Sequence, residues 1–366
     1  MIYLSCLIIL SVYAFCVLLA LIGWLIPNRV PAESKLKGVP TLIVPFRNEE
    51  NNLPKLISSI HGQSIHPKVI FVDDHSTDDS ISKISLSNFE VILNSGEGKK
   101  MASYSGIQAA RSELLLFTDA DSQLPNEYVK NISENYAYTN FDFFYGPVLN
   151  STPKKSFFKT IFFLDQLALT GIAVGSGRMN VHLFCSGANM GGKKSVLIQA
   201  SEKLNHSTNL SGDDSTLLSY CSSKNKKVVA LTDKKFAITT NGPNTLVEFL
   251  KQRLRWGQKT GFNSNLGLIF LSLTVFLSSC TVIFCLISSI SDFWNIHWLL
   301  LPAGKLLIDL LFLFLVSYRL GVTQKMWCFV PAWIFNILYI PIITLTGFFY
   351  SGTWKGRKIR VKEIGK

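Results

Sequence analysis

The sequence has few charged side chains for its length. Only 16% of its 366 residues are Asp, Glu, Lys or Arg, whereas 48% are hydrophobic; a typical soluble domain has about 25% charged residues. Cysteine patterns that bind metal or form disulfides are also missing. Five of the seven cysteines fall in long apolar runs, and the other two, Cys185 and Cys221, are isolated. Without a Cys-x-x-Cys or Cys/His ligand spacing, we expect neither a zinc site nor a disulfide framework.

Acidic residues are outnumbered, with 24 Asp and Glu against 36 Lys and Arg and a formal net charge of +12. Such an excess can indicate nucleic acid binding. Here part of it flanks apolar segments, where anionic lipid headgroups attract Lys and Arg. We therefore expect membrane lipids, and no nucleic acid, among the partners.

Four long apolar runs predict membrane-spanning helices. Residues 2–26 carry no charged side chain, and a helix of this length crosses a hydrocarbon core of about 30 Å. A signal peptide is the alternative, but the run is long, lacks a basic start and ends at Pro27-Asn28-Arg29 instead of small residues. The other runs occupy residues 266–290, 296–316 and 327–350. Lys305 and Asp309 are four residues apart in one of them, so we expect them to pair on one helix face.

These runs divide the chain into an N-terminal transmembrane helix (2–26), a soluble domain (27–265), a C-terminal transmembrane region of about three helices (266–350) and a basic tail (351–366). The soluble domain contains no uninterrupted apolar run long enough to span. Lys and Arg follow the first span and join the last two, so the positive-inside rule places the soluble domain in the cytosol. Four crossings then leave the basic tail outside, against the same rule. Either one C-terminal segment is re-entrant or interfacial, or the tail is an exception.

The soluble domain reads as alternating strands and helices. Apolar strand patterns occupy residues 40–45, 68–72, 91–93 and 113–117. Polar groups come directly after these strands, and the carboxyl ends of parallel strands share the sheet edge at which open α/β sheets bind ligands. The sequence therefore predicts an α/β fold with a mostly parallel, Rossmann-like sheet and a binding site at one edge.

The first groups at that edge suit a nucleotide. The Asp74 carboxylate can accept a hydrogen bond from the imide N–H of a uracil, and Asn48 or Glu49 can hold neighbouring polar groups of the nucleoside. Lys99 follows Gly98 and offers a compact positive charge to a diphosphate, while the glycine permits close backbone approach.

Asp119 and Asp121 supply the hard oxygen ligands that Mg²⁺ or Mn²⁺ prefers when it also binds phosphates. A short acidic pair is common by chance, and Asp74 or Asp78 could instead cap the following helix. The prediction therefore depends on the order of these groups along the chain and not on any one of them.

This order resembles the family 2 glycosyltransferases, over residues 41–256. The segments that carry the resemblance are Val44-Pro45-Phe46-Arg47-Asn48-Glu49, Val72-Asp73-Asp74-His75-Ser76-Thr77-Asp78, Gly98-Lys99, Thr118-Asp119-Ala120-Asp121, Cys185-Ser186-Gly187-Ala188-Asn189-Met190, Gly212-Asp213-Asp214 and Gln252-Arg253-Leu254-Arg255-Trp256. Two departures are visible: Asp213 stands where Glu is common, and Ser103-Tyr104 replace the usual Leu-Asn. The resemblance implies a domain of the GT-A fold flanked by transmembrane helices.

The resemblance also implies residue roles. Asp214, supported by Asp213, would be the general base of an inverting transfer. The donor site would comprise Pro45, Asn48, Glu49, Asp73, Asp74, Lys99, Asp119, Gln252, Arg255 and Trp256. Asp119 and Asp121 would hold a divalent cofactor, Mg²⁺ or Mn²⁺. The acceptor site would comprise Ser186, Gly187, Asn189 and Trp256.

Two further segments have apolar faces. Residues 245–257 mix apolar and basic side chains with the spacing of an amphipathic helix at a membrane interface. Residues 157–174 are apolar apart from Lys159 and Asp165. This segment either lies on the membrane and guides a lipid acceptor, or forms a core helix.

The resemblance implies a bacterial inner-membrane enzyme with a cytosolic catalytic domain, which transfers a sugar from a nucleotide sugar, expected to be UDP-linked, to a lipid or lipid-linked hydroxyl. A processive polysaccharide synthase is the alternative, although four spans are few for a channel. Two alternatives come from other classes: a catalytically silent membrane scaffold, which the intact acidic motifs disfavour, and a nucleotidyltransferase, which would not need the Gln-x-x-Arg-Trp motif.

Overall fold

The computed structural model describes residues 1–28, 38–152, 156–205, 213–261, 265–291, 296–347, 353–354 and 357–358. The chain forms two compact units. The sheet unit comprises Ile26–Ser151 and Phe184–Asn241, and the helical unit comprises Met1–Leu25, Thr152–Leu183 and Gly242–Lys366. This division differs from the sequence-based one, because residues 152–183 and the segment that follows Asn241 belong with the helices.

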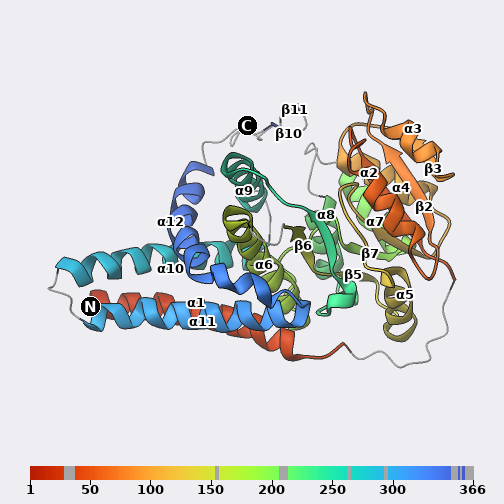
Figure 1. Cartoon of the computed structure of the whole chain (residues 1–366). Helices are drawn as coiled ribbons and strands as arrows, with labels where there is room; N and C mark the ends of the chain where they lie inside the picture. The colour runs from red at the N-terminus through yellow and green to blue at the C-terminus, as the bar shows by residue number, and fades with distance from the viewer. Residues whose placement is uncertain are drawn as a thin grey trace, which may run out of the picture. The chain divides into compact units, whose positions relative to one another are not determined.

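The sheet unit is built on a seven-stranded sheet in the order β3-β2-β1-β4-β7-β5-β8 (Figure 1). Its strands are β1 (Thr41–Phe46), β2 (Lys68–Asp73), β3 (Glu90–Leu93), β4 (Leu114–Phe117), β5 (Phe143–Tyr145), β7 (Met190–Lys193) and β8 (Val228–Ala230). All its neighbouring strands are parallel except that β7 runs antiparallel to β4 and β5. A second, parallel pair joins β6 (Val148–Ser151) to β9 (Ile238–Asn241). The predicted α/β fold with a mostly parallel sheet is confirmed.

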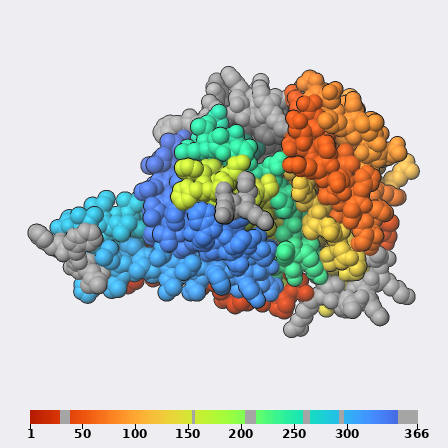
Figure 2. Space-filling view, viewed as in Figure 1, coloured from red at the N-terminus to blue at the C-terminus, as the bar shows by residue number. Residues whose placement is uncertain are grey.

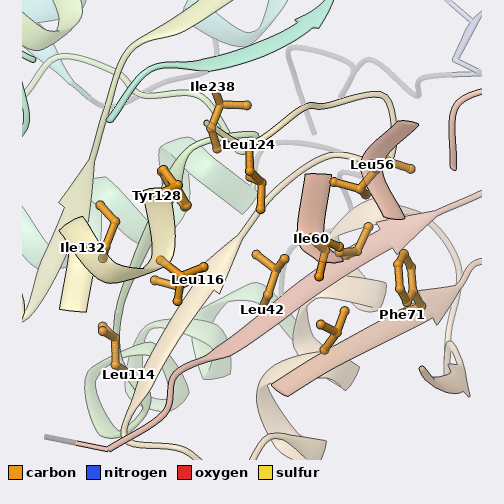
Figure 3. Packing of buried hydrophobic residues seen from close by; sticks show 14 of the residues in the cluster. Leu42, Leu56, Ile60, Phe71, Leu114, Leu116, Leu124, Tyr128, Ile132 and Ile238 are labelled. Carbon is orange, nitrogen blue, oxygen red and sulfur yellow. The ribbon is translucent and has the colours of Figure 1, made fainter. Parts of the chain in front are cut away.

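Helices connect these strands: α2 (Leu53–His61), α3 (Ser80–Ser85), α4 (Lys99–Ala109), α5 (Tyr128–Thr139), α7 (Lys194–Asn205), α8 (Asp213–Ser223) and the 3₁₀ turn η1 (Lys234–Phe236). In α2, apolar residues recur with helical spacing, so Leu56 and Ile60 point to the sheet. There they meet Leu42 of β1 and Phe71 of β2 (Figure 3). Because β1 is buried along its whole length, its sequence is a continuous apolar run without alternation.

The helical unit contains α1 (Ile2–Leu25), α6 (Phe157–Arg178), α9 (Leu246–Gly261), α10 (Leu266–Ser291), α11 (Ile296–Leu320), the 3₁₀ turn η2 (Thr323–Cys328), α12 (Phe329–Gly347) and the short strands β10 (Thr353–Trp354) and β11 (Arg357–Lys358). Among the described residues, five helices are long and apolar enough to cross a membrane. Four match the predicted spans. The fifth is α6, where the sequence predicts no spanning run, because Lys159 and Asp165 interrupt the apolar pattern without ending the helix.

Much of the surface of this unit is apolar. Helices α10, α11 and α12, cyan to blue in Figure 2, expose large hydrophobic side chains: Leu273, Phe284, Ile287, Leu307, Leu311, Phe314, Ile334, Leu338 and Ile342. Water does not favour such a surface, whereas lipid does. The exposed faces of α10, α11 and α12 therefore suit contact with membrane lipid.

Helices α1 and α6 pack with almost no space between their backbones. A Cβ atom added to Gly23 would lie 1.9 Å from the carbonyl oxygen of Gly175, so both positions require glycine. Next to this contact, the Trp24 indole Nε1 donates a 2.8 Å hydrogen bond to the Gly171 carbonyl. Small residues allow this kind of close approach between helices in membranes.

Helices α1 and α11 run in the same direction. Tyr3 stacks edge-on against Trp298, and ten residues later Tyr13 hydrogen-bonds Asp309. The end of α1 therefore lies at the same end of the bundle as the end of α11. The start of α12 lies there too, since the short η2 joins α11 to it.

Both ends of α6 contact this one end of the bundle. At its start, the Phe157 ring lies 6.2 Å from the ring of Trp327, just before α12. In its second half, Gly171 packs against Val316 of α11, and Gly175 packs against Ala20 of α1. A helix that crossed the bilayer would contact opposite ends of the bundle, so the packing favours α6 as a helix that lies across one end.

Candidate active site

The loops after β1 and β2 are joined by hydrogen bonds. Asn48 has the positive φ of 51° that Asn tolerates. Its backbone N–H donates to the Ser76 hydroxyl at 3.0 Å, and its side-chain oxygen accepts from the Thr77 N–H at 2.8 Å. Glu49 follows, and its carboxylate accepts a 2.6 Å hydrogen bond from the Asn52 amide. These bonds fix the loop that contains two predicted donor residues.

Asp73 and Asp74 are almost fully buried at the end of β2. Asp73 accepts the Ser76 N–H and so closes its own turn. The Oδ1 atom of Asp74 accepts 2.8 Å hydrogen bonds from the Asn94 amide and from the Gly98 N–H. Asp74 therefore holds the loop that leads into Lys99, a contact that the sequence analysis did not foresee. Asn94, which follows β3, was missed; its only sequence signal is its place at the end of that strand.

Asp78 has the local role that was held open as an alternative. Burial acts to raise the pKa of this carboxyl, but hydrogen bonds from Ser80 and from the Glu50 N–H outweigh it and lower the pKa. Asp78 thus supports the start of α3 and the β1 loop.

Lys99 is the first residue of α4, directly after Gly98 with φ of 87°. Its ammonium group forms an ion pair with the Asp119 carboxylate, at the end of β4. Both side chains are partly exposed, at 23% and 33% of their surface. The structure thus brings together the predicted phosphate-side lysine and the first acid of the predicted metal motif.

Asp121 lies in a crowded acidic environment. Burial, with the charges of Asp119 and Glu49, raises the pKa of its carboxyl to about 7, although Lys99 opposes the shift. Negative groups held this close favour a cation among them. Among the described residues no three Asp, Glu, His or Cys side chains form a metal cluster. Asp119 and Asp121 therefore fit a cation that takes its remaining ligands from phosphates and water, as Mg²⁺ commonly does.

The loop before β7 meets this group at Gly187. A Cβ atom added there would lie 3.0 Å from the Lys99 Nζ and 3.8 Å from the Asp214 Cβ. The Cys185 thiol also approaches the Asp214 carbonyl, at 3.6 Å. Three segments that are far apart in the sequence, those of Lys99, Gly187 and Asp214, therefore converge within the sheet unit.

Asp214 is in the first turn of α8, and its Oδ1 atom accepts a 2.7 Å hydrogen bond from the Ser215 N–H. Ser186 is half-buried, and its hydroxyl accepts a 3.4 Å hydrogen bond from the Ala188 N–H. Pro45 is buried inside β1. Gly212, and the side chain of Asp213, lie outside the described residues.

The acceptor role of Asn189 stays a prediction, and the structure gives this residue a structural role. Its side chain is fully buried. The amide nitrogen donates to the carbonyls of Pro147 and Phe236, at 2.7 and 2.8 Å, and the amide oxygen accepts from the Tyr128 hydroxyl at 2.8 Å. Asn189 therefore ties β7 to its neighbouring loops, with both polar atoms of its side chain hydrogen-bonded inside the sheet unit.

Gln252, Arg255 and Trp256 lie on α9, in the helical unit. They are half-buried. Between them in the sequence, Arg253 is buried and forms an ion pair with Asp165 of α6. The sequence shows both charged residues but does not predict their pairing, because nothing in the spacing of residues 165 and 253 indicates a contact.

The sheet is mostly parallel and carries a lysine, two carboxylates and a further Asp near its carboxyl edge, which is the arrangement expected of a GT-A domain. The comparisons agree. Residues 41–199 match the family described as glycosyl transferase family 2. The chain therefore contains a family 2 glycosyltransferase domain.

Two curated relatives support this assignment. The chain is 34% identical over 130 residues to the 4,4'-diaponeurosporenoate glycosyltransferase of Staphylococcus haemolyticus, which covers 31% of this chain and 35% of that protein. It is 30% identical over 103 residues to the undecaprenyl-phosphate 4-deoxy-4-formamido-L-arabinose transferase of Shewanella sediminis, covering 25% and 31%. The matches thus span about a third of the length of these relatives.

A solved structure resembles nearly the whole chain. A mannosyltransferase from Pyrobaculum calidifontis, in complex with GDP-Man and Mn²⁺, superposes with a TM-score of 0.58 and covers 93% of this chain and 99% of its own. At 17% sequence identity, this likeness shows a shared fold.

Proposed function

We propose that this protein is a membrane glycosyltransferase that transfers a sugar from a nucleoside diphosphate sugar to a lipid or lipid-linked acceptor, with inversion at the anomeric carbon. The proposed donor is UDP-linked, and the proposed location is a bacterial inner membrane with the sheet unit in the cytosol. One observation supports it most: within one unit, Lys99 and Asp214 meet at Gly187, Lys99 pairs with Asp119, and the Asp119 charge acts on Asp121.

Each side chain in this group has a chemical task. Lys99 would neutralise the diphosphate of the donor. Asp119 and Asp121 would hold a divalent cation, and this cation would stabilise the leaving diphosphate as a Lewis acid. The relative with the matching fold was solved with GDP-Man and Mn²⁺, which supports both the donor class and the cofactor.

Asp214 would act as general base. The acceptor oxygen attacks C1 of the sugar, the bond between C1 and the phosphate oxygen breaks, and the acceptor proton passes to the Asp214 carboxylate. The nucleoside diphosphate leaves with the bonding electron pair. A single displacement of an α-linked donor gives a β-linked product.

The need for a base depends on the acceptor. A lipid hydroxyl keeps its proton at neutral pH, so its attack requires a base. The names of the two relatives instead indicate a carboxylate and a phosphate, and both groups are already ionised at that pH. The effect of removing the Asp214 carboxylate therefore reports the chemical class of the acceptor.

We expect Asp214→Asn to lower kcat about 10²- to 10⁴-fold with a hydroxyl acceptor, which is the usual contribution of a positioned base. Donor binding should persist, because the change leaves Lys99 and the metal motif in place. A much smaller loss would favour a phosphate or carboxylate acceptor. Unchanged turnover with a hydroxyl acceptor would remove Asp214 from the mechanism.

The overall proposal is tested with detergent-purified protein, Mn²⁺, a panel of UDP- and GDP-sugars and a bacterial lipid extract. Nucleotide release and the mass of the product are measured. A lipid that gains one or two sugars supports the proposal, whereas a polymer ladder indicates a processive synthase. No release from any donor, with Asp121→Ala behaving like the wild type, would indicate a silent scaffold.

A further inference from the structure

The helical unit contains a buried ion pair that involves the Gln252-x-x-Arg255-Trp256 helix. The Arg253 Nε of α9 donates a 2.7 Å hydrogen bond to Oδ2 of Asp165 on α6, and its Nη2 pairs with the same oxygen. The two side chains are only 5% and 6% exposed. A charge pair this deeply buried loses hydration, so removing one partner leaves the other charge uncompensated.

A third helix completes the site. Oδ1 of Asp165 accepts hydrogen bonds from the Asn336 amide, at 3.0 Å, and from the Tyr339 hydroxyl, both on α12. We name Asp165, Arg253, Asn336 and Tyr339 the Asp165 cluster. One carboxylate therefore connects α6, α9 and α12 through directional bonds.

Arg253 also contacts the motif on either side of it. Its guanidinium lies 4.8 Å from the centroid of the Phe249 ring and 4.4 Å from that of Trp256. Its Nη1 donates a 3.3 Å hydrogen bond to the Gln252 side-chain oxygen. The cation thus touches two of the three motif residues, in contacts that depend on orientation.

A second buried ion pair in the same unit offers a comparison. Lys305 and Asp309 of α11 pair at 2.5 Å, which confirms the predicted pairing, and Asp309 also accepts from the Tyr13 hydroxyl and the Trp333 indole. Asp165 and Asp309 line the same cavity of about 80 Å³. The two carboxylates therefore share an environment and the same kinds of partner, but the Asp309 contacts reach α1 and α12 and not α9.

We propose that Asp165 is a positioning residue for the Gln252-x-x-Arg255-Trp256 segment. Apolar contacts, such as that of Phe249 with Phe162 of α6, hold α9 against its neighbours without fixing its rotation. The ion pair with Asp165 fixes that rotation, and Arg253 passes the constraint to Gln252 and Trp256. This inference rests on the proposed function insofar as the segment serves the transfer reaction.

The test compares Asp165→Asn with the matched variant Asp309→Asn. Asp165→Asn should lower kcat/KM about 100-fold, the scale of loss that follows a small misplacement of a binding group. Asp309→Asn should keep kcat/KM close to that of the wild type at a comparable loss of Tm. If both variants lose kcat/KM equally, in proportion to their loss of Tm, the Asp165 cluster has only a structural role.

A double variant separates stability from position. Asp165→Asn leaves Arg253 buried without its counter-charge, whereas Asp165→Asn with Arg253→Gln removes both charges and should recover much of the Tm. The double variant should nevertheless remain slow, because neither side chain then orients the motif. Recovery of kcat/KM together with Tm would overturn the proposal.

A readout without turnover distinguishes failure of this inference from failure of the proposed function. In hydrogen–deuterium exchange of the full chain in detergent, Asp165→Asn should speed exchange in residues 246–257, and Asp309→Asn should not. Unchanged exchange in residues 246–257 would overturn the positioning role even in an active enzyme. If the wild type transfers no sugar, the exchange result still decides whether Asp165 anchors α9.

Discussion

At the scale of single residues, Asp121 should make metal binding depend on pH. Its carboxyl has a pKa of about 7, raised by burial and by the charges of Asp119 and Glu49. A metal ligand must be deprotonated. The group is protonated below that pKa and ionised above it, so affinity for a cation should increase as pH rises through 7.

For a single site with this pKa, the ionised fraction rises about tenfold between pH 6 and pH 8, and the affinity for Mn²⁺ should rise by about the same factor. Titration followed by electron paramagnetic resonance of free Mn²⁺ measures it. Asp121→Asn should bind weakly at both pH values. Equal affinity of the wild type at pH 6 and pH 8 would contradict a ligand carboxyl at Asp121 with a pKa near 7, and unchanged Mn²⁺ affinity in Asp121→Asn would remove Asp121 from the site.

The sequence motif around Asn189 does not show which way its side chain points. Asn189→Ala removes three side-chain hydrogen bonds from a fully buried position. It should therefore lower the free energy of unfolding by about 2–4 kcal/mol, at the usual net value of each bond. A thermal melt in detergent should show a Tm several degrees lower. Ser186→Ala, in the same loop, should leave Tm nearly unchanged; a similar drop there would contradict this difference.

At the scale of elements, the periodicity of the sequence predicts the first strands well. The predicted strands 40–45, 68–72 and 113–117 agree with β1, β2 and β4 within one residue at each end. These strands are buried, so their apolar runs are unambiguous. Strand β7 contains Gly191 and Gly192 and so lacks an apolar run, and β5 and β8 have only three residues each. The sequence pattern did not predict these three strands.

The sequence pattern of α6 does not show whether the helix spans the membrane or lies across one end of the bundle. Its length and composition suit a membrane span, but its contacts place both of its ends at one end of the bundle. The distinction lies in tertiary packing against α1, α11 and α12, which is invisible in the sequence of residues 157–178. This packing of α6 determines whether the chain crosses the bilayer four times or five.

We expect cysteines at the two ends of α6 to react from the same side of the membrane. Phe158 and Val181 are 64% and 38% exposed, so Phe158→Cys and Val181→Cys should both be tolerated. In sealed vesicles of known orientation, an impermeant maleimide should label both or neither. The unsubstituted chain, with its own seven cysteines, sets the background. Labelling of the two positions from opposite sides would establish α6 as a span.

At the scale of the whole molecule, the sequence indicated a membrane-bound glycosyltransferase, and it assigned α6 and α9 to the soluble domain, whereas in the structure they pack with the helical unit. Both helices carry charges, and Asp165 and Arg253 gave them a soluble character. The two charges pair in the folded chain, so the net charge of the pair is zero and the helices can be buried among apolar neighbours. Composition records the charges but not the pairing.

The insertion of α6 between β6 and β7 means that the sheet unit is not a contiguous soluble fragment. A fragment of residues 38–241 retains α6 but lacks α1, α11 and α12, and so exposes its buried side chains, which include Ile161, Leu164, Leu167 and Val174. We expect this fragment to aggregate without detergent, because an apolar face of this size is not stable in water.

Replacing residues 156–180 of that fragment with a flexible Gly/Ser linker should restore solubility. A linker of about 20 residues has a root-mean-square span of about 25 Å, so we expect it to rejoin β6 and β7, which belong to two different sheets of the sheet unit, without tension. Size-exclusion chromatography without detergent should then give a monomer, with the circular dichroism of an α/β protein. The sheet unit keeps its own core around Leu42, Leu116 and Phe144, so its folding does not require α6. If the fragment that retains α6 is itself a soluble monomer, the helix does not depend on the membrane helices for its burial, and its assignment to the helical unit is wrong.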